Sequence, residues 1–600
     1  MNRLSGLFHN DYWRYLMGAI GKPSHFIGYW GDGDCTKTLS RLVPDYCIRQ
    51  GKLSEWAIAS ASVLTADRVT LNACGRFGPT DFPGDAWAAV EAQQLRLGRD
   101  PFGRVPLYWM QLRETIWFST QMQLLLPLIA SSQISPIALH TYACFSYVPT
   151  PLTPIEQIAS VAAGSEMIWE IADIKDLPKV RSLPSAWQEA PQLLRSEDEA
   201  IAQLQRLLQQ AIDRQVADLP IDEPVGVLLS GGIDSSLVTA LLVKAGLQVR
   251  AYALDFGVEA YSELPYAQQV ADFFQIPLIR VAATGDAVLR AIGPTAKALD
   301  LPYGDGTTAA LFLLKQAAAQ DVRVVFNGEN GDQLFAGWTN KPLIANGVYS
   351  AEHPAGGETF EQQYLRTFQR FYGYEKQIFS PQMLDRIQSH DLSVYLQDAI
   401  DPGCLSKRCP SLLARLRRAS LMLKGAQNIQ PRATALAFAC GLWVRSPFCD
   451  PDLTDWTFQL PGELLLQGAC EKYILKKASE RWLPPEIVWR EKRGMGVPLK
   501  VWYYREFWAA IGDRLNPNVL RSQNCWQPHL ADSMLSGQLG VTMRDRYIGN
   551  NLWLLLMWQA WRTEVLGEIP VKRSLDHVFW LPPAIGQRIW KYRRRLTVDC

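Results

Sequence analysis

The segment VGVLLSGGIDSS, residues 225–236, joins an apolar, strand-like run to a turn rich in glycine and serine. Gly231 and Gly232 let the backbone turn tightly, with no Cβ in the way of an anion. A helix is expected to begin directly after the turn, and its free N–H groups and dipole favour a bound phosphate. The segment therefore predicts a phosphate-binding loop, with Asp234 beside it as a carboxylate able to hold Mg²⁺. The alternative is a glycine-rich turn without a ligand.

Strands and helices alternate on both sides of this loop. A parallel sheet covered by helices on both faces is the fold that such alternation indicates, and ligands bind at the carboxyl ends of its strands. A long amphipathic helix is predicted over 199–219, and mostly helical structure from about 344 onward. The predicted strands are 225–229, 249–256, 278–282 and 322–326, and the predicted helices are 236–245, 264–275, 285–300 and 307–319.

The first 190 residues have a different pattern, with short β-type runs such as 95–97, 105–110 and 115–119 separated by Gly and Pro. Six hundred residues exceed what one hydrophobic core organises. We therefore expect two domains, 1–190 and 197–600, joined by an aperiodic linker around 182–194 that contains Pro184 and Pro191. The first domain should be an antiparallel sheet-rich sandwich and the second an α/β domain.

Composition narrows the function classes. The formal net charge of +1 gives no reason to expect nucleic acid as a partner. The 11 cysteines form no C-x-x-C pair and no zinc-type spacing, which is typical of a reduced, cytoplasmic enzyme. The N-terminus has no secretory signal pattern. The longest apolar runs, 435–444 and 552–557, fall short of the roughly twenty residues that a membrane span needs.

Five ordered segments resemble asparagine synthetase and its relatives, the ATP pyrophosphatases. The loop SGGIDS resembles the pyrophosphate-binding loop of that family. The other four resemble its Arg-Asp-x-Phe-Gly, Ser-Gly-Glu-Gly-Ala-Asp-Glu, Arg-x-Pro-Phe-Leu-Asp and Lys-x-Gly-Phe-Gly-Val-Pro-Leu segments. They are RDPFGRVPLY (99–108), NGENGDQLFAG (327–337), RSPFCD (445–450) and KRGMGVPL (492–499). The resemblance implies a glutamine amidotransferase-like, Ntn-hydrolase-like α+β sandwich. A doubly wound ATP pyrophosphatase domain with a helical extension should follow it.

The resemblance also implies an activity, in which ATP activates a carboxylate as an acyl-adenylate and an amine then attacks it. Glu329 would be the acid/base group, Lys492 would neutralise charge on the adenylate, and Asp234 with Asp332 would hold Mg²⁺. Structural alternatives are a helix N-cap role for Glu329, a solvated Lys492 and a structural ion pair for Arg445. The residues expected to contact ATP are Leu228, Ser230, Gly231, Gly232, Asp234, Ser235, Ser236, Leu254 and Gly328.

One family residue is missing. Asn2 stands where the family has the cysteine nucleophile that releases ammonia from glutamine, and an amide cannot replace a thiolate. We therefore expect an inert glutaminase domain. Relatives without this cysteine include the β-lactam and carbapenam synthetases and the macrolactam cyclases of lasso peptides, which use an amine of the same molecule.

Two residues favour a peptide substrate. Trp443 replaces a family Glu, and Glu329 is retained where β-lactam synthetases have Tyr. We predict macrolactam formation in a lasso-type precursor peptide, with a leader-peptide-binding protein and a cysteine protease as partners. Asparagine synthesis from free ammonia and a non-catalytic scaffold are the alternatives.

Overall fold

The computed structural model describes most of the chain, and every structural statement below concerns the described residues. They are 23, 25–31, 34–50, 56–60, 68–71, 84–91, 93–183, 187–189, 196–337, 360–368, 370–400, 409–491, 494–536, 539, 545–569, 571, 578–586 and 588–589.

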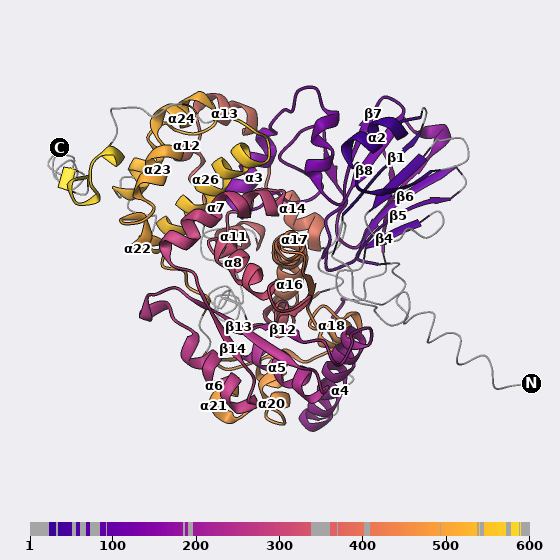
Figure 1. Cartoon of the computed structure of the whole chain (residues 1–600), viewed down its shortest axis with the longest axis vertical. Coiled ribbons are helices and arrows are strands. Elements are labelled where there is room, and N and C mark those ends of the chain that lie inside the picture. The colour runs from indigo at the N-terminus through magenta and orange to yellow at the C-terminus, as the bar shows by residue number, and fades with distance from the viewer. Residues whose placement is uncertain are drawn as a thin grey trace, which may run out of the picture.

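Two antiparallel sheets form the N-terminal part, at the upper right of Figure 1. Their facing sides meet in a core that includes Trp30, Ile58, Leu97 and Phe118, so the expected antiparallel sandwich is confirmed. The first sheet has the order β2 (Cys47–Gln50), β3 (Trp56–Ser60), β1 (Phe26–Gly31), β8 (Thr115–Ser119), β7 (Tyr108–Leu112) and β9 (Ala159–Ser160). The second has the order β11 (Lys179–Ser182), β10 (Ser165–Glu170), β6 (Gln94–Arg99), β5 (Ala86–Glu91) and β4 (Arg68–Leu71).

A five-stranded sheet, parallel throughout, organises the C-terminal part. Four of its strands were predicted. The fifth, β16, was not, because it is only three residues long and overlaps the end of the apolar run 435–444, which has no strand-type alternation. The order is β14 (Leu278–Ala282), β13 (Val249–Asp255), β12 (Val225–Leu228), β15 (Val324–Phe326) and β16 (Trp443–Arg445).

Helices cover both faces of this sheet, which confirms the doubly wound arrangement. Along β13, Ala251 and Ala253 pack with one group of helices and Tyr252 and Leu254 with another, because successive side chains of a strand point to opposite faces. The first group is α4 (Glu197–Val216), α5 (Ile233–Lys244) and α6 (Leu264–Phe274), and the second includes α7 (Gly285–Leu299) and α8 (Thr308–Ala318).

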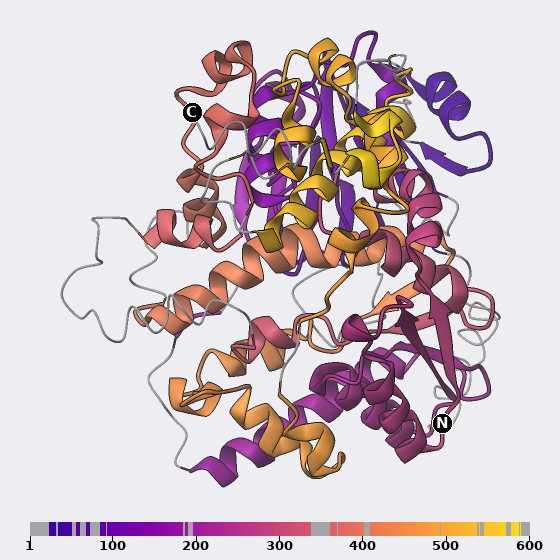
Figure 2. The same ribbon diagram turned by 90° about the vertical axis from the view of Figure 1, so that its left-hand side faces the viewer.

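A long helix crosses the middle of the molecule, between the antiparallel sheets and the parallel sheet (Figure 2). It runs from α16 (Leu412–Ala419) through a π-helical segment, η5 (Ser420–Ile429), into α17 (Gln430–Ala439). π-helical turns are rare and are frequent at functional sites. The π-helical segment brings Lys424 to the cavity described below, and the start of α17 brings Arg432.

The remaining helices of the C-terminal part are α9 (Gly331–Leu334), which precedes residue 344, and those of the extension expected after that residue. Of the described helices, none is both long and apolar enough to cross a bilayer. The remaining helices of the extension are α11 (Phe360–Arg366), α12 (Glu375–Ile378), α13 (Pro381–Ile387), α14 (Ser393–Ile400), α18 (Pro451–Thr457), α19 (Gly462–Leu465), α20 (Tyr473–Ser479), α21 (Pro485–Val488), α22 (Leu499–Tyr503), α23 (Trp508–Arg514), α24 (Pro517–Ser522), α25 (Leu530–Leu535) and α26 (Asp545–Glu564).

The two parts of the chain share a core. Helix α3 (Pro136–Phe145), which belongs to the N-terminal part, packs against α26: the Tyr142 hydroxyl donates to the Leu554 carbonyl at 2.8 Å, and its ring lies 5.2 Å from that of Trp558. In the expected linker, Trp187 is buried and packs 5.1 Å from Phe102. The boundaries 1–190 and 197–600 stay a prediction, and the core joins both sides of them.

Arg445, the last residue of β16, forms a structural ion pair, which was the alternative given for it from the sequence. Its guanidinium is buried and meets the Asp218 carboxylate at 2.6 and 2.8 Å, a two-point contact that fixes both groups. The same guanidinium donates to the Gln215 carbonyl at the end of α4. The pair therefore fastens the edge strand to the helix that opens the α/β part.

We predict that Arg445→Met lowers the thermal midpoint by several degrees, since removing one partner of a buried pair leaves the other charge uncompensated, at a cost of about 3–5 kcal/mol. The control is Lys179→Met, which breaks a pair with Glu170 whose lysine is 71% exposed, where the midpoint should hardly change because exposed pairs contribute little. Thermal unfolding followed by circular dichroism makes the comparison. Equal midpoints for the two variants would contradict the role assigned to Arg445.

Candidate active site

The loop predicted to bind phosphate lies between β12 and α5, and its shape depends on Gly231. This residue has φ +71°, and a Cβ there would lie 2.5 Å from the backbone carbonyl carbon of Tyr266 in α6. Any side chain would therefore be strained twice, by its conformation and by the contact. Helix α5 begins at Ile233, three residues before the predicted start. The first turn therefore contains Asp234 and Ser235, and its unpaired N–H groups belong to the loop.

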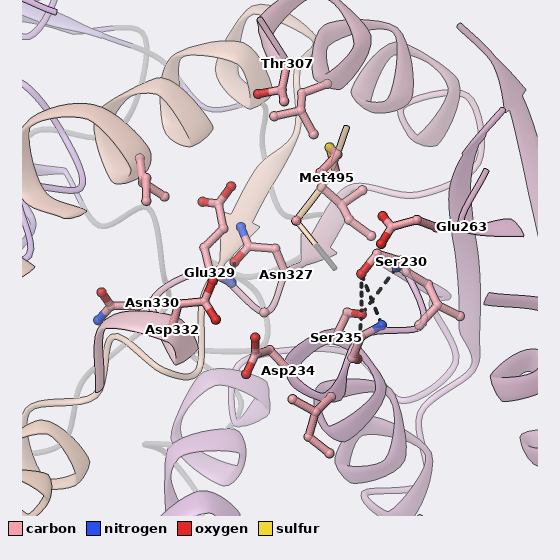
Figure 3. Close-up of a pocket in the computed structure, with 18 of the residues that line it drawn as sticks. Ser230, Asp234, Ser235, Glu263, Thr307, Asn327, Glu329, Asn330, Asp332 and Met495 are labelled. Carbon is pink, nitrogen blue, oxygen red and sulfur yellow. Dashed lines mark hydrogen bonds between the residues drawn. The ribbon is translucent and has the colours of Figure 1, made fainter. Parts of the chain in front are cut away.

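Serine hydroxyls hold the loop in place. The Oγ atoms of Ser230 and Ser235 lie 3.2 Å apart, the Ser230 N–H donates to Ser235 Oγ at 3.3 Å, and the Gly232 N–H donates to Ser230 Oγ at 3.3 Å (Figure 3). Ser236 is different, since it is fully buried inside α5. Ser230 and Ser235 are therefore placed to contact a ligand, whereas Ser236 lies behind the loop.

A cavity of about 450 Å³ opens over this loop at the carboxyl ends of β12, β13 and β15. Its volume is in the usual range for small-ligand sites. Figure 3 shows the loop on one side and Glu329 and Asp332 on the other. Of the residues predicted to bind ATP and metal, those that line it are Leu228, Ser230, Gly232, Asp234, Ser235, Leu254, Gly328 and Asp332, whereas Gly231 and Ser236 do not.

Asp234 and Asp332 meet at Lys472, a residue that the sequence reasoning missed. The buried Lys472 ammonium contacts a carboxylate oxygen of Asp234 and lies 2.5 Å from Oδ1 of Asp332. Burial lowers the pKa of Lys472, but the charges and hydrogen bonds of the two carboxylates outweigh burial and leave that pKa above its usual value. Lys472 is therefore a fixed cation between the two acids.

The same acids suit Mg²⁺. Each carboxylate has two oxygens, and Lys472 contacts one oxygen of each. Two carboxylates directed at one cation beside a phosphate-binding loop form the hard oxygen donor set that Mg²⁺ uses together with substrate phosphates. Asp234 and Asp332 therefore fit the predicted metal role, with Lys472 as a permanent positive charge beside it.

Glu329 points into the cavity from the turn after β15 (Figure 3). Its backbone N–H donates to Asn327 Oδ1 at 3.1 Å, and its buried Oε2 has no hydrogen-bond partner among the described residues. Helix α9 begins at Gly331 after Asn330, with no side-chain cap, so the N-cap alternative for Glu329 is wrong. Burial raises the pKa of Glu329, against the opposing charges of Lys315 and Arg432.

Buried cations surround Glu329, and the sequence reasoning missed these as well. Lys315 is fully buried in α8, and burial lowers its pKa. Arg432 of α17 is nearly as buried and pairs with Asp305 at 2.9 Å. The apolar periodicity that predicted helix 307–319 concealed Lys315, because a lysine inside an apolar face carries no separate signal. Lys315 and Arg432 thus lie among the two acids Glu329 and Asp305, and their positive charges oppose the effect of burial on Glu329.

Gly328 is required for packing. A Cβ on this residue would lie 2.7 Å from the Ser235 backbone nitrogen and 2.8 Å from Asp234. Only glycine lets the turn after β15 approach the first turn of α5 so closely. Gly328 therefore sets the distance between the phosphate loop and the segment that carries Glu329 and Asp332.

The sequence also singled out Lys492, Asn2 and Trp443. Lys492 and Asn2 lie outside the described residues. Arg490, two residues before Lys492, lines the cavity, donates to the Gly231 carbonyl at 2.9 Å and stacks 3.6 Å from the Tyr266 ring, and so supports the loop. Trp443 packs on Phe438 at 5.6 Å and does not line the cavity. The inference from Trp443 to a peptide-sized site therefore has no support in the geometry.

Comparison with known families agrees with the geometry. The profile of the asparagine synthase family matches residues 203–563, which is more than half of the chain. The chain belongs to the asparagine synthase family. A glutamine amidotransferase domain profile also matches residues 86–179, within the antiparallel part.

Individual relatives with similar sequences are named asparagine synthetases. The chain is 24% identical over 429 residues to the glutamine-hydrolyzing asparagine synthetase 1 of Bacillus subtilis, covering 68% of this chain and 66% of that protein. A putative asparagine synthetase of Mycobacterium bovis is 24% identical over 444 residues, covering 69% and 66%. The chain thus spans just under two thirds of the length of these relatives. Among solved structures, the NH3-dependent NAD synthetase of Campylobacter jejuni is 18% identical with a TM-score of 0.20, covering 39% of this chain and 96% of that one.

We predict that Gly231→Ala abolishes ATP binding, because the added methyl group must move the loop away from α6. The control is Gly246→Ala: Gly246 has a similar φ of +80°, but a Cβ there meets nothing within 4 Å. That variant should lose only about 1–2 kcal/mol of stability from the left-handed backbone and bind ATP normally. Isothermal titration calorimetry with ATP and Mg²⁺ separates the two. Normal ATP affinity in Gly231→Ala would show that the loop is not the phosphate site.

Proposed function

We propose that this chain is an ATP-dependent carbon–nitrogen ligase that activates a carboxylate as an acyl-adenylate and transfers the acyl group to an amine. The observation that carries the proposal is the single cavity in which the phosphate-binding loop, the Asp234–Lys472–Asp332 cluster and buried Glu329 all meet. Family membership supports the same reaction class.

In the first step, a substrate carboxylate oxygen attacks the α-phosphorus of ATP, and the bond to the pyrophosphate breaks. The N–H groups at the start of α5 and the hydroxyls of Ser230 and Ser235 hold the leaving pyrophosphate. Lys472 keeps Asp234 and Asp332 in position and adds a positive charge nearby. Mg²⁺, when held by these two carboxylates, neutralises phosphate charge at this point.

In the second step, an amine attacks the acyl carbon, and AMP leaves. Glu329 accepts the proton of the attacking amine. Its raised pKa makes it a stronger base than an exposed glutamate, and Lys315 and Arg432 favour its ionised form. Lys492 remains our candidate for the charge that develops on the adenylate.

The amine should not come from glutamine. Asn2 replaces the nucleophile of the family, and the amidotransferase profile matches only from residue 86 onward. An ammonia-releasing thiol is therefore missing from the position where the resemblance expects it. The amine must then be free ammonia or a group on the substrate itself.

For the substrate, we propose a peptide with an internal Asp or Glu whose own amine closes a macrolactam, as in lasso-type precursors. The loss of the glutaminase nucleophile and the retained Glu329 support this choice. A leader-peptide-binding protein and a cysteine protease are the partners that such a substrate would require. The cytoplasm is the compartment in which we expect this reaction, given the cysteine usage.

A second candidate is asparagine formation from aspartate and free ammonia. The names of the relatives favour it. So do Lys424 and Arg432 in the cavity wall, which could bind the second carboxylate of a small acidic substrate.

We predict that Glu329→Gln keeps adenylate formation and loses amide formation. Gln preserves shape but cannot take up the amine's proton, and a positioned base is worth about 10²–10⁴ in rate. The assays are ATP–pyrophosphate exchange and mass spectrometry of the product, with two substrates tested separately. One is L-aspartate with ammonium, and the other is a synthetic peptide with a free N-terminal amine and an internal Asp or Glu.

The wild-type pH profile provides the control. Glu329 acts only when ionised, so amide formation should fall as the pH drops through its raised pKa, while exchange continues. Replacing ammonium with glutamine should give no product and no glutamate. Amide formation at the wild-type rate in folded Glu329→Gln would place the base elsewhere. Which of the two substrates supports exchange decides between the macrolactam and the asparagine proposals.

A further inference from the structure

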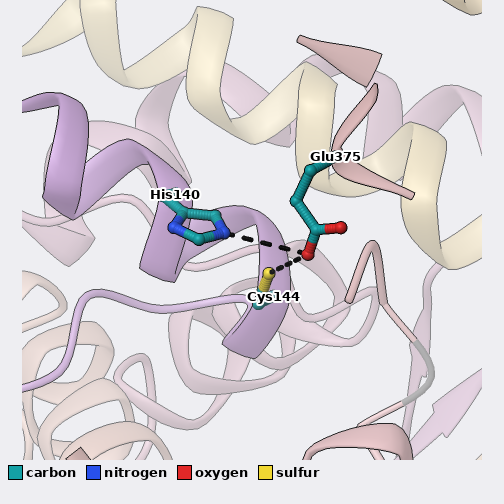
Figure 4. Close-up of side chains that lie close together, drawn as sticks. All are labelled: His140, Cys144 and Glu375. Carbon is teal, nitrogen blue, oxygen red and sulfur yellow. Dashed lines mark hydrogen bonds and ion pairs between the residues drawn. The ribbon is translucent and has the colours of Figure 1, made fainter. Parts of the chain in front are cut away.

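Away from the ATP cavity, three side chains with metal-binding atoms lie together between α3 and α12 (Figure 4). His140 and Cys144 are four residues apart on one face of α3, and Glu375 is the first residue of α12. His140 Nε2 lies 3.8 Å from Glu375 Oε1, and Cys144 Sγ lies 3.9 Å from the same oxygen. All three ligand atoms lie within 4.8 Å of one another.

The donor set and its size suit zinc. Imidazole nitrogen, thiolate and carboxylate are the three ligand types that Zn²⁺ uses, and its bond lengths place tetrahedral ligand atoms about 3.3–3.7 Å apart. The two separations from Glu375 Oε1, 3.8 and 3.9 Å, are only slightly wider. His140 Nε2 and Cys144 Sγ lie within 4.8 Å of each other, so the side chains must move closer together to share one ion.

His140 is oriented for this role by the residues behind it. Its Nε2 is buried and has no hydrogen-bond partner among the described residues. On the other side of the ring, Nδ1 lies 2.9 Å from His390 Nδ1, and His390 Nε2 lies 3.0 Å from the Tyr395 hydroxyl. This chain allows the tautomer in which His140 Nδ1–H donates to His390 and the Nε2 lone pair faces Cys144 and Glu375. A ring nitrogen fixed from behind is the usual arrangement of a metal-binding histidine.

The electrostatics favour a cation at this place. The Glu375 carboxylate lies 3.8 Å from His140 Nε2 and 3.9 Å from Cys144 Sγ, so an acidic group faces both other ligand atoms. A divalent ion would complement this carboxylate and convert the thiol to a thiolate, with release of its proton.

We propose that His140, Cys144 and Glu375 bind one zinc ion, with a water molecule as the fourth ligand. The Glu375 side chain is 26% exposed, which leaves the water a solvent-facing side. None of the three residues lines the ATP cavity. The ion would therefore tie α3 of the N-terminal part to α12 of the C-terminal part. The site does not depend on the proposed ligase activity.

The test is metal binding by the full chain. Protein stripped with a chelator is titrated with Zn²⁺, and bound metal is counted by mass spectrometry. Co²⁺ serves as a spectroscopic probe, because a thiolate ligand gives a sulfur-to-cobalt charge-transfer band. The variants are Cys144→Ser and Glu375→Gln, with Cys409→Ser as a matched control. Cys409 is also a buried thiol but lies in a different core.

We expect one zinc per chain in the wild type, a thiolate–cobalt band, and a thermal midpoint that rises with zinc. Cys144→Ser should lose the band and the thermal shift, and Glu375→Gln should bind at least about tenfold more weakly. Cys409→Ser should behave like the wild type. The proposal is overturned if the wild type binds no more zinc than Cys144→Ser. It is also overturned if Cys409→Ser removes the cobalt band, because the metal would then be adventitious.

Discussion

Lys472 between Asp234 and Asp332 is the interaction on which the rest of the site depends. Its ammonium joins three segments that are far apart in the sequence: the first turn of α5, helix α9 and the residue before α20. A buried charge cluster of this kind is stable only while it is complete, because losing one member leaves another uncompensated. The surrounding backbone has adapted to it. A Cβ on Gly337 would lie 1.8 Å from the Lys472 side chain, so only glycine fits there.

The glycines of the two loops follow from the same geometry. Gly231 lets the phosphate loop lie against α6, and Gly328 lets the turn after β15 reach α5. With both contacts made, the loop and the acids line one cavity and Glu329 is buried beside Lys315 and Arg432. The site therefore combines a pyrophosphate-sized anion cradle with a base in a separate, positively charged wall. A reaction that first releases pyrophosphate and then accepts a proton needs both.

Much of this could be read from the sequence, and the rest could not for physical reasons. The alternation around residues 225–326 predicted four of the five parallel strands, because each had its own apolar run, whereas β16 did not. The loop with Asp234 was predicted from the strand before it and its glycines, and Glu329 and Asp332 from the resemblance of residues 327–337 to a family segment. Lys315 and Arg432 were missed because they lie in helices, and Lys472 because it lies in the turn before α20, where only the tertiary fold shows which way a charged side chain points. The N-cap alternative for Glu329 depended on where α9 begins, which sequence patterns locate poorly.

The most direct test of the account is the fate of ATP in the presence of a carboxylate substrate. Wild-type protein and Asp332→Asn are incubated with [³²P]pyrophosphate, ATP and either L-aspartate or the synthetic peptide, and the nucleotide products are separated. The account predicts exchange that requires the carboxylate, AMP as the product, and a loss of about 10²–10³ in rate in folded Asp332→Asn. Formation of ADP and phosphate, or exchange at the wild-type rate in Asp332→Asn, would contradict it.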